Sequence, residues 1–214
     1  MHSLFCAAAL FVSVLTLSGC AADRAVVHHP RALDDTRVGL GFFSHAAAGA
    51  RRDYFHADNF TLDAPARLTA LEWAGLVDGP AGAGLENVSG FVVRFIPFPE
   101  NEPGEPVAER RFALGETHPS PTGRLGSGAN EASAAREFTH RVALEPAVEL
   151  VAGDYLLVVA AELIDPSAAN WQWQDGETSD GFSASWSYAR ERWEGVQDTD
   201  SAFTLIGTST PLDD

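Results

Sequence analysis

Carboxylate and amide side chains occur near both ends of a long run of predicted strands, where they could hold a metal ion. Asp58 and Asn59 lie in a predicted strand near the start of this run, and Asp198 and Asp200 directly precede its last strand. Ca²⁺ prefers several such oxygen ligands, and the first and last strands of a jelly roll are often neighbours. These four residues form a candidate calcium site, for which the alternative is a set of solvated acidic turns.

Closely spaced indoles are a second candidate site. Trp171 and Trp173 are two residues apart in a predicted strand, so their side chains share a face. An exposed indole can stack on a sugar ring, while the amides of Gln172 and Gln174 could bond its hydroxyl groups. Trp186, in a later predicted strand, is a further candidate for this carbohydrate-binding face. The alternative is that most of the five tryptophans fill the core.

The sequence shows no catalytic signature, and we expect a protein without enzymatic activity. No serine lies in a G-x-S-x-G turn, and no histidine pair has the close spacing of a zinc site. His140 falls on the apolar face of a predicted strand, so we expect a core residue with satisfied hydrogen bonds. A glycoside-type hydrolase is an unfavoured alternative, because nothing singles out one pair among so many carboxylates.

Composition narrows the class of partner. The 214 residues carry a formal net charge of −16, and all 14 basic residues are arginines. We do not expect the protein to bind nucleic acid, because binding to a phosphate backbone requires clustered positive charge. A bound cation or a neutral ligand is compatible with this charge.

The elements that would position these residues are strands throughout. The segment Tyr155 to Leu163 is almost continuously apolar, which predicts a central strand buried on both faces. Around Arg67 to Trp73 the apolar set shifts from Leu68 to Leu71 and Trp73, which predicts a bulge or burial on both faces. About ten short strands with turns between them favour a single all-β domain, an antiparallel sandwich or barrel. The predicted strands are 38–43, 54–62, 67–73, 90–96, 107–114, 138–144, 155–163, 171–174, 182–188 and 202–206.

The N-terminus carries a resemblance to bacterial lipoproteins. An apolar segment from Leu4 to Leu17 ends in Leu17-Ser18-Gly19-Cys20, which is similar to the lipobox of that family. The resemblance implies removal of residues 1–19 as a signal peptide and acylation of Cys20. It departs from the family in having no Lys or Arg before the apolar segment. Ala21 at the next position favours the outer membrane, and the alternative is an ordinary secretory peptide.

The remaining domain boundaries follow from that resemblance. Residues 20–37 are expected to be a lipidated tether and residues 38–214 the sandwich domain, with a flexible loop near 115–135. Cys6 falls in the segment to be removed and Cys20 is the anchor, so the mature domain is expected to lack a disulfide.

Three segments give the domain itself a family resemblance. They are 57–62 (ADNFTL), 150–156 (LVAGDYL) and the ending formed by 171–174 (WQWQ) and 202–207 (AFTLIG). Over about residues 53 to 207 they resemble the jelly-roll-type sandwich modules of exported bacterial proteins, including those of the PEP-CTERM type. The resemblance implies an extracytoplasmic surface protein without a settled activity. The polar tail and the lipobox depart from it, since such proteins carry a C-terminal sorting helix.

Taken together, the sequence predicts a non-enzymatic lipoprotein of the cell envelope with a jelly-roll-like β-sandwich. Its expected partners are the membrane, through the lipid, and a glycan or an envelope protein. No cofactor other than the candidate Ca²⁺ is expected.

Overall fold

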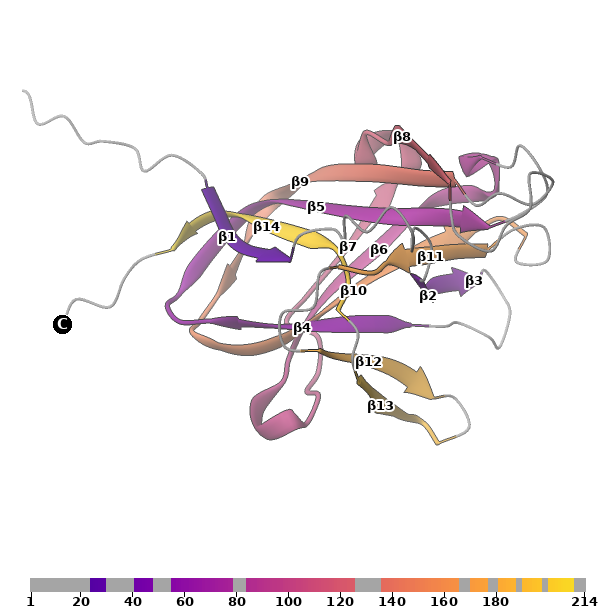
Figure 1. The fold of residues 1–214 in the computed structure, drawn as a ribbon. Helices are drawn as coiled ribbons and strands as arrows, with labels where there is room; N and C mark the ends of the chain where they lie inside the picture. Colours follow the sequence, from indigo (N-terminus) through magenta and orange to yellow (C-terminus); the bar gives the residue numbers. More distant parts are fainter. Residues whose placement is uncertain are drawn as a thin grey trace, which may run out of the picture.

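The protein is a sandwich of two β-sheets packed face to face (Figure 1). The computed structural model describes residues 24–29, 41–47, 55–78, 84–125, 136–165, 170–176, 181–187, 190–197 and 200–209. Each predicted strand has a counterpart, and β1, β3, β8 and β13 are additional. The strands are β1 (Arg24–His29), β2 (Gly41–Phe43), β3 (His45–Ala47), β4 (His56–Leu62), β5 (Ala66–Asp78), β6 (Val88–Pro97), β7 (Ala108–Ala113), β8 (Ser120–Leu125), β9 (Arg136–Leu150), β10 (Gly153–Leu163), β11 (Asn170–Gln174), β12 (Phe182–Ser187), β13 (Arg192–Gln197) and β14 (Phe203–Ser209). Three short 3₁₀ turns, η1 (Leu85–Asn87), η2 (Pro99–Asn101) and η3 (Leu114–Thr117), complete the described elements.

The first sheet is organised around β5. One edge of β5 pairs with β9 along most of its length, and β8 extends the sheet beyond β9. The other edge is divided: β14 pairs with Ala66–Trp73, and β11 pairs with Gly75–Asp78. Consequently β14 and β11 lie end to end, and β1 and β2 pair with their outer edges.

The second sheet is organised around β10, the strand that the sequence predicts to be central. One edge of β10 pairs with β6, and β7 lies beyond it. The other edge is again divided, between β4 at Gly153–Val158 and the short parallel strand β3 at Ala161–Leu163. The hairpin β12–β13 extends the sheet beyond β4. Because residues 155 to 161 of β10 are all buried, the prediction of burial on both faces is confirmed.

The main core lies between the sheets and is built by alternation along the strands. Phe91, Val93 and Phe95 of β6 point inward, and Phe91 packs edge-on against Trp73 from the opposite sheet. A smaller apolar cluster covers the outer face of the second sheet, with Leu156, Val158 and Ala160 fully buried. Side chains on both faces of β10 are thereby removed from water.

A bulge interrupts the first sheet at the segment where the apolar pattern of the sequence predicts either a bulge or burial on both faces. The ladder between β5 and β9 shifts register between Leu68 and Ala70, and the ladder between β5 and β14 shifts between Ile206 and Gly207. The Thr69 hydroxyl donates a hydrogen bond to the carbonyl oxygen of Ile206 at this point. The bulge lets Leu68 and Leu71 both reach the interior, which strict alternation would forbid.

Two segments expected to lie outside the sheets belong to them. Arg24–His29, within the predicted tether, forms β1 against β14. Ser120–Leu125, within the predicted loop, forms β8 against β9. The loop was predicted because this segment has few large apolar residues. β8 lies exposed at the edge of the sheet, and a strand in that position can form without them. Residues 126–135 lie outside the described part.

Close packing at Gly75 provides a test of the inter-sheet core. A Cβ atom at this position would overlap the ring of Trp171 on the neighbouring strand β11. We therefore expect Gly75→Ala to lower the free energy of unfolding by about 1–3 kcal/mol, because overpacking forces the indole out of its site. Urea unfolding followed by circular dichroism measures this change. Gly115→Ala, where a Cβ would meet nothing within 4 Å, is the control, and equal stability of both variants would contradict the packing.

Candidate functional site

The indole pair proposed for sugar binding is buried. Trp171 and Trp173 are both 0% exposed and point into the inter-sheet core. Trp171 contacts Phe91 edge-on, and Trp173 Nε1 donates a hydrogen bond to the Ala202 carbonyl oxygen. The candidate of an exposed platform is corrected, and for these two indoles the alternative of a core position is confirmed: they share a face, and that face is directed toward the opposite sheet.

The other residues of the proposed carbohydrate face are dispersed. Gln172 is half-buried, whereas Gln174 is 2% exposed and its Oε1 atom has no hydrogen-bond partner. Trp186 is half-buried on β12 and packs edge-on against Trp193, directly opposite on β13. Trp193 packs against the apolar cluster on the outer face of the second sheet. Of the three proposed tryptophans, Trp186 alone keeps exposed surface.

The predicted calcium ligands separate into different environments. Asp58 is 0% exposed and faces the interior with Phe60 and Leu62, whereas Asn59 alternates to the outer face of the second sheet. Asn59 therefore cannot share a site with Asp58, and this part of the expectation is corrected. Asp200 is also buried, and Asp198 lies outside the described residues.

The structure nevertheless brings the region of Asp58 to the start of the last strand, as predicted. The Ser201 backbone N–H donates a 2.7 Å hydrogen bond to Asp58 Oδ2, joining the two sheets. Asp200 holds a neighbouring segment: its carbonyl oxygen accepts from Gly176 N–H, and its Oδ2 accepts from Gly181 N–H. These contacts place the end of β11 beside the start of β14.

A third carboxylate, not among the predicted ligands, joins this region. Asp175 forms an isolated antiparallel bridge with Ser201 at the junction between β11 and β14. Burial, together with the negative charge of Asp58, raises the pKa of Asp175 to about 7. The sequence marks Asp175 as part of a carboxylate-rich loop but gives no sign of its neighbour, because Asp58 is more than a hundred positions away.

Serine and histidine side chains complete this polar region between the sheets. Ser183 and Ser185 lie opposite Asp58 and His56 in the β12–β4 ladder. The Nδ1 atom of His56 is 3.1 Å from the hydroxyl oxygen of Ser185. Burial lowers the pKa of His56 to about 3. His56 is consequently neutral near pH 7. We call Asp58, Asp175, Ser183 and Ser201 the joint cluster, because they lie where the divided edges of the two sheets face each other.

His140 is a core residue, as predicted. Its ring stacks on Trp73 at 5.0 Å between centroids, and its Nδ1 lies 3.1 Å from Thr117 Oγ1. The Thr117 hydroxyl donates its one proton to the Leu114 carbonyl oxygen, so His140 Nδ1–H must be the donor to Thr117. Nε2 then carries no proton and has no hydrogen-bond partner, so His140 is satisfied at one nitrogen.

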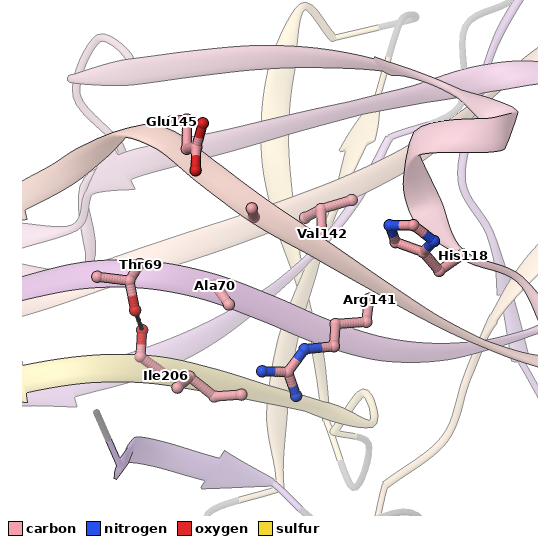
Figure 2. Close-up of a pocket in the computed structure, with 8 residues that line it drawn as sticks. Thr69, Ala70, His118, Arg141, Val142, Glu145 and Ile206 are labelled. Carbon is pink, nitrogen blue, oxygen red and sulfur yellow. Dashed lines mark hydrogen bonds between the residues drawn. The ribbon is translucent and has the colours of Figure 1, made fainter. Parts of the chain in front are cut away.

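A depression of about 440 Å³ lies on the outer face of the first sheet, beside the bulge (Figure 2). Thr69 and Ile206 line one side, and His118 and Arg141 line the other. His118 has a left-handed backbone with φ of 43°, uncommon for a residue other than glycine. Arg141 is already paired with Glu72. The depression could receive a small polar group, but its main cation is engaged by the protein itself.

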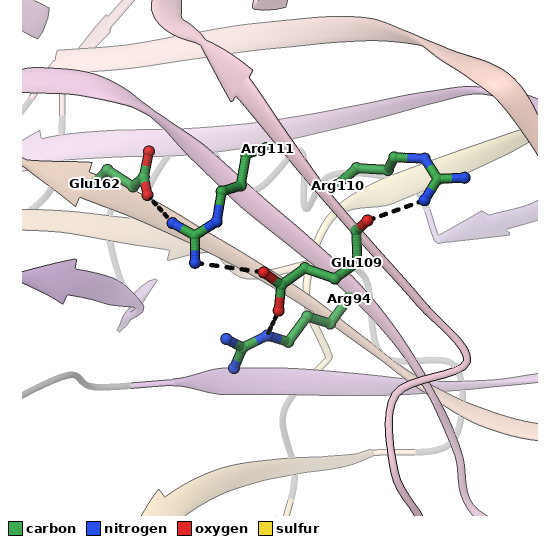
Figure 3. Close-up of polar contacts among 5 residues, drawn as sticks. All are labelled: Arg94, Glu109, Arg110, Arg111 and Glu162. Atoms are coloured by element: carbon green, nitrogen blue, oxygen red, sulfur yellow. Dashed lines mark hydrogen bonds and ion pairs between the residues drawn. The ribbon is translucent and has the colours of Figure 1, made fainter.

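Ion pairs cross the outer face of the second sheet (Figure 3). Glu109 pairs with Arg94 and Arg111, and Arg111 also pairs with Glu162. Burial acts to raise the pKa of Glu109, but the Arg94 and Arg111 contacts outweigh it and hold that pKa below its usual value. These partly exposed pairs neutralise one another, so this arginine group is not a free anion site.

The chain matches no protein-family model, no curated protein and no solved structure. Within the described residues, no helix has the length and apolar character to span a membrane. The same residues contain no group of three or more His, Cys, Asp or Glu side chains arranged to hold a metal ion.

Proposed function

We propose that the protein is a non-enzymatic lipoprotein of the bacterial cell envelope, with a binding or structural role at the membrane surface. The observation that carries the proposal is Leu17-Ser18-Gly19-Cys20 at the end of an apolar segment. Two or more acyl chains on Cys20 would hold the domain on a membrane, where a single chain would not. Cys20 itself lies outside the described residues.

The position of β1 supports a domain held close to that membrane. β1 begins at Arg24 and is paired with β14. Four residues span at most about 14 Å, so an anchor at Cys20 would keep this edge of the first sheet near the lipid headgroups. The β12–β13 hairpin belongs to the other sheet and is the part that carries the half-buried Trp186 and Trp193. We place the outer membrane first as the location, because Ala21 follows the cysteine; a secreted form is the alternative.

Carbohydrate binding remains the second candidate, in a changed position. The observation that favours it is the cross-strand pair of Trp186 and Trp193, whose rings are 5.6 Å apart at a sheet edge. A glycan array probed with the full chain and with Trp186→Ala tests it, and a signal unaffected by the substitution would contradict it.

Glycoside hydrolysis has less support. Asp175 has a raised pKa and Asp58 is its neighbour, and glycosidases also place a carboxyl group of raised pKa near a second carboxylate. However, Asp58 is completely buried between the sheets, so a sugar cannot approach it. We therefore retain the non-enzymatic proposal.

Replacing Cys20 tests the lipid anchor. We expect Cys20→Ser to move the protein from the membrane fraction, and from the detergent phase of a Triton X-114 partition, into the aqueous fraction. Intact-mass measurement of the wild type should show removal of residues 1–19 and added acyl chains. Cys6→Ser is the matched control and should fractionate as the wild type does. Membrane association that survives Cys20→Ser would refute the proposal.

A further inference from the structure

The joint cluster lies where, in each sheet, one strand ends and another takes its place along the edge of the central strand. In the first sheet β11 gives way to β14 along the edge of β5, and Asp175 faces Ser201 at that junction. In the second sheet β4 gives way to β3 along the edge of β10. The single residue Ser44 separates β2 in one sheet from β3 in the other, and its hydroxyl accepts a hydrogen bond from His56 N–H. The apolar core is replaced here by polar side chains.

The residues of the joint cluster come together from four segments of the chain. Partners in an antiparallel bridge point to the same face of a sheet, so the side chains of Asp175 and Ser201 lie on one side. The backbone of Ser201 is bonded to the Asp58 carboxylate, which directs Asp58 to the same place. Ser183 is directly opposite Asp58 in the β12–β4 ladder and is fully buried.

Two of these oxygen atoms have no hydrogen-bond partner. The Ser201 Oγ atom belongs to a residue with 0% exposure, and the Asp175 Oδ1 atom is equally inaccessible. A buried polar atom without a partner is unfavourable by about 1–3 kcal/mol and therefore calls for an explanation such as a bound ion.

We propose that the joint cluster binds a hard divalent cation, Ca²⁺ in the first place, through Asp58, Asp175, Ser201 and Ser183. All four donors are oxygen atoms, which Ca²⁺ prefers over nitrogen or sulfur, with water or main-chain oxygen filling its remaining positions. Asp175 is half-buried, whereas Asp58, Ser183 and Ser201 are buried, so its side of the cluster is nearest to solvent. The site needs only two carboxylates, so it is compatible with the lack of a three-membered acidic group among the described residues.

A cation at this position would fasten the two sheets to each other. Asp58 and Ser183 belong to the second sheet, whereas Asp175 and Ser201 adjoin strands of the first. The domain has no cysteine after Cys20 and hence no disulfide of its own. A bound ion would cross-link the two sheets, as a disulfide does in other exported domains. This role does not depend on the lipid anchor or on a ligand bound at the surface.

Melting temperature and terbium luminescence of the full chain, purified in detergent, test the site. After EDTA treatment, addition of Ca²⁺ to about 100 times its dissociation constant should raise the melting temperature by about 5–10 °C. Tb³⁺ should show luminescence sensitised by tryptophan, because Trp173 lies close to the cluster. Its ring centroid is 6.3 Å from that of His56, which is two residues from Asp58. Mg²⁺ and Mn²⁺ are tested in the same assay.

Three variants separate a lost ligand from a lost fold. Ser201→Ala removes a buried hydroxyl without a hydrogen-bond partner, so the metal-free melting temperature should stay the same or rise, while the affinity for Ca²⁺ falls about tenfold or more. Asp175→Asn should abolish the Ca²⁺-dependent increase in melting temperature. Asp63→Asn, at an exposed carboxylate in the turn after β4, should behave as the wild type. Absence of any cation-dependent shift or luminescence in the wild type, or wild-type affinity in Ser201→Ala, would overturn the proposal.

Discussion

Trp171→Ala is expected to lower the free energy of unfolding by about 3–5 kcal/mol, a large fraction of the stability of an ordinary domain. The indole is fully buried, lies over Gly75 and meets Phe91 with ring centroids 5.2 Å apart. Its removal leaves a cavity between two sheets whose backbones are fixed by hydrogen bonds and cannot collapse into it. Urea unfolding followed by circular dichroism measures the loss.

Two further substitutions sharpen this prediction. Trp171→Phe should be less destabilising than Trp171→Ala, because it keeps the ring and removes an indole N–H that has no hydrogen-bond partner. Trp186→Ala, at a half-buried indole on β12, should have a smaller effect. If Trp171→Ala unfolds at the wild-type urea concentration, the indole is not in the core and the sugar-binding interpretation of this strand regains support.

The second large expected effect is loss of stability in acid, caused by buried histidines. Burial lowers the pKa of His140 and of His56 from 6.5 to about 3. Between these values the unfolded chain binds a proton at each histidine and the folded chain does not. Stability is therefore fully present above pH 6.5 and declines as the pH falls, by about 1.4 kcal/mol per pH unit for each such proton.

Asp175 opposes this trend. Its folded pKa of about 7 exceeds its ordinary value of 3.8, so the folded chain binds a proton that the unfolded chain lacks between these values. This contribution is present at low pH and is lost as the pH rises through 7. From about pH 4 to 6.5 the two histidines and Asp175 leave a net difference of one proton, or about 1.4 kcal/mol per pH unit.

His140→Phe should flatten that dependence to near zero over the same range. Phenylalanine retains the stacking on Trp73, and the Thr117 hydroxyl keeps its bond to Leu114. The measurement is the free energy of urea unfolding at half-unit pH steps in EDTA-containing buffer. His118→Asn, at an exposed histidine whose left-handed backbone suits asparagine, should leave the dependence unchanged. A wild-type slope in His140→Phe would mean that His140 is protonated in the folded protein.

The core strands were predictable from local pattern because burial acts on each strand with a fixed period. The unbroken apolar run of β10 indicated that both faces of this strand are covered, and its residues 155 to 161 are all buried. The step from Leu68 to Leu71 indicated a bulge or burial on both faces, and the register shift between Leu68 and Ala70 shows the bulge. β1 and β8 escaped prediction, because strands at the margin of a sheet bury too little to show a period.

The candidate sites were less predictable, because alternation says which residues share a face but not where that face looks. It placed Trp171 and Trp173 together correctly, while their burial depends on a second sheet that no local pattern describes. Asp58 was expected near the last strand, and it does bond to Ser201. Asp175 and Ser183 carry no signal of that neighbourhood, since they come from separate segments.

The sequence by itself therefore determined the fold class, the main strands, the core position of His140 and the lipobox hypothesis. Each of these depends on residues close together in the chain. Only the tertiary structure decided that the indoles face inward, that Asn59 turns away from Asp58, that Ser183 lies opposite Asp58 and that Asp175 pairs with Ser201. These outcomes depend on how distant strands divide the edges of β5 and β10, and that pairing is fixed by the burial of the whole domain rather than by any single segment.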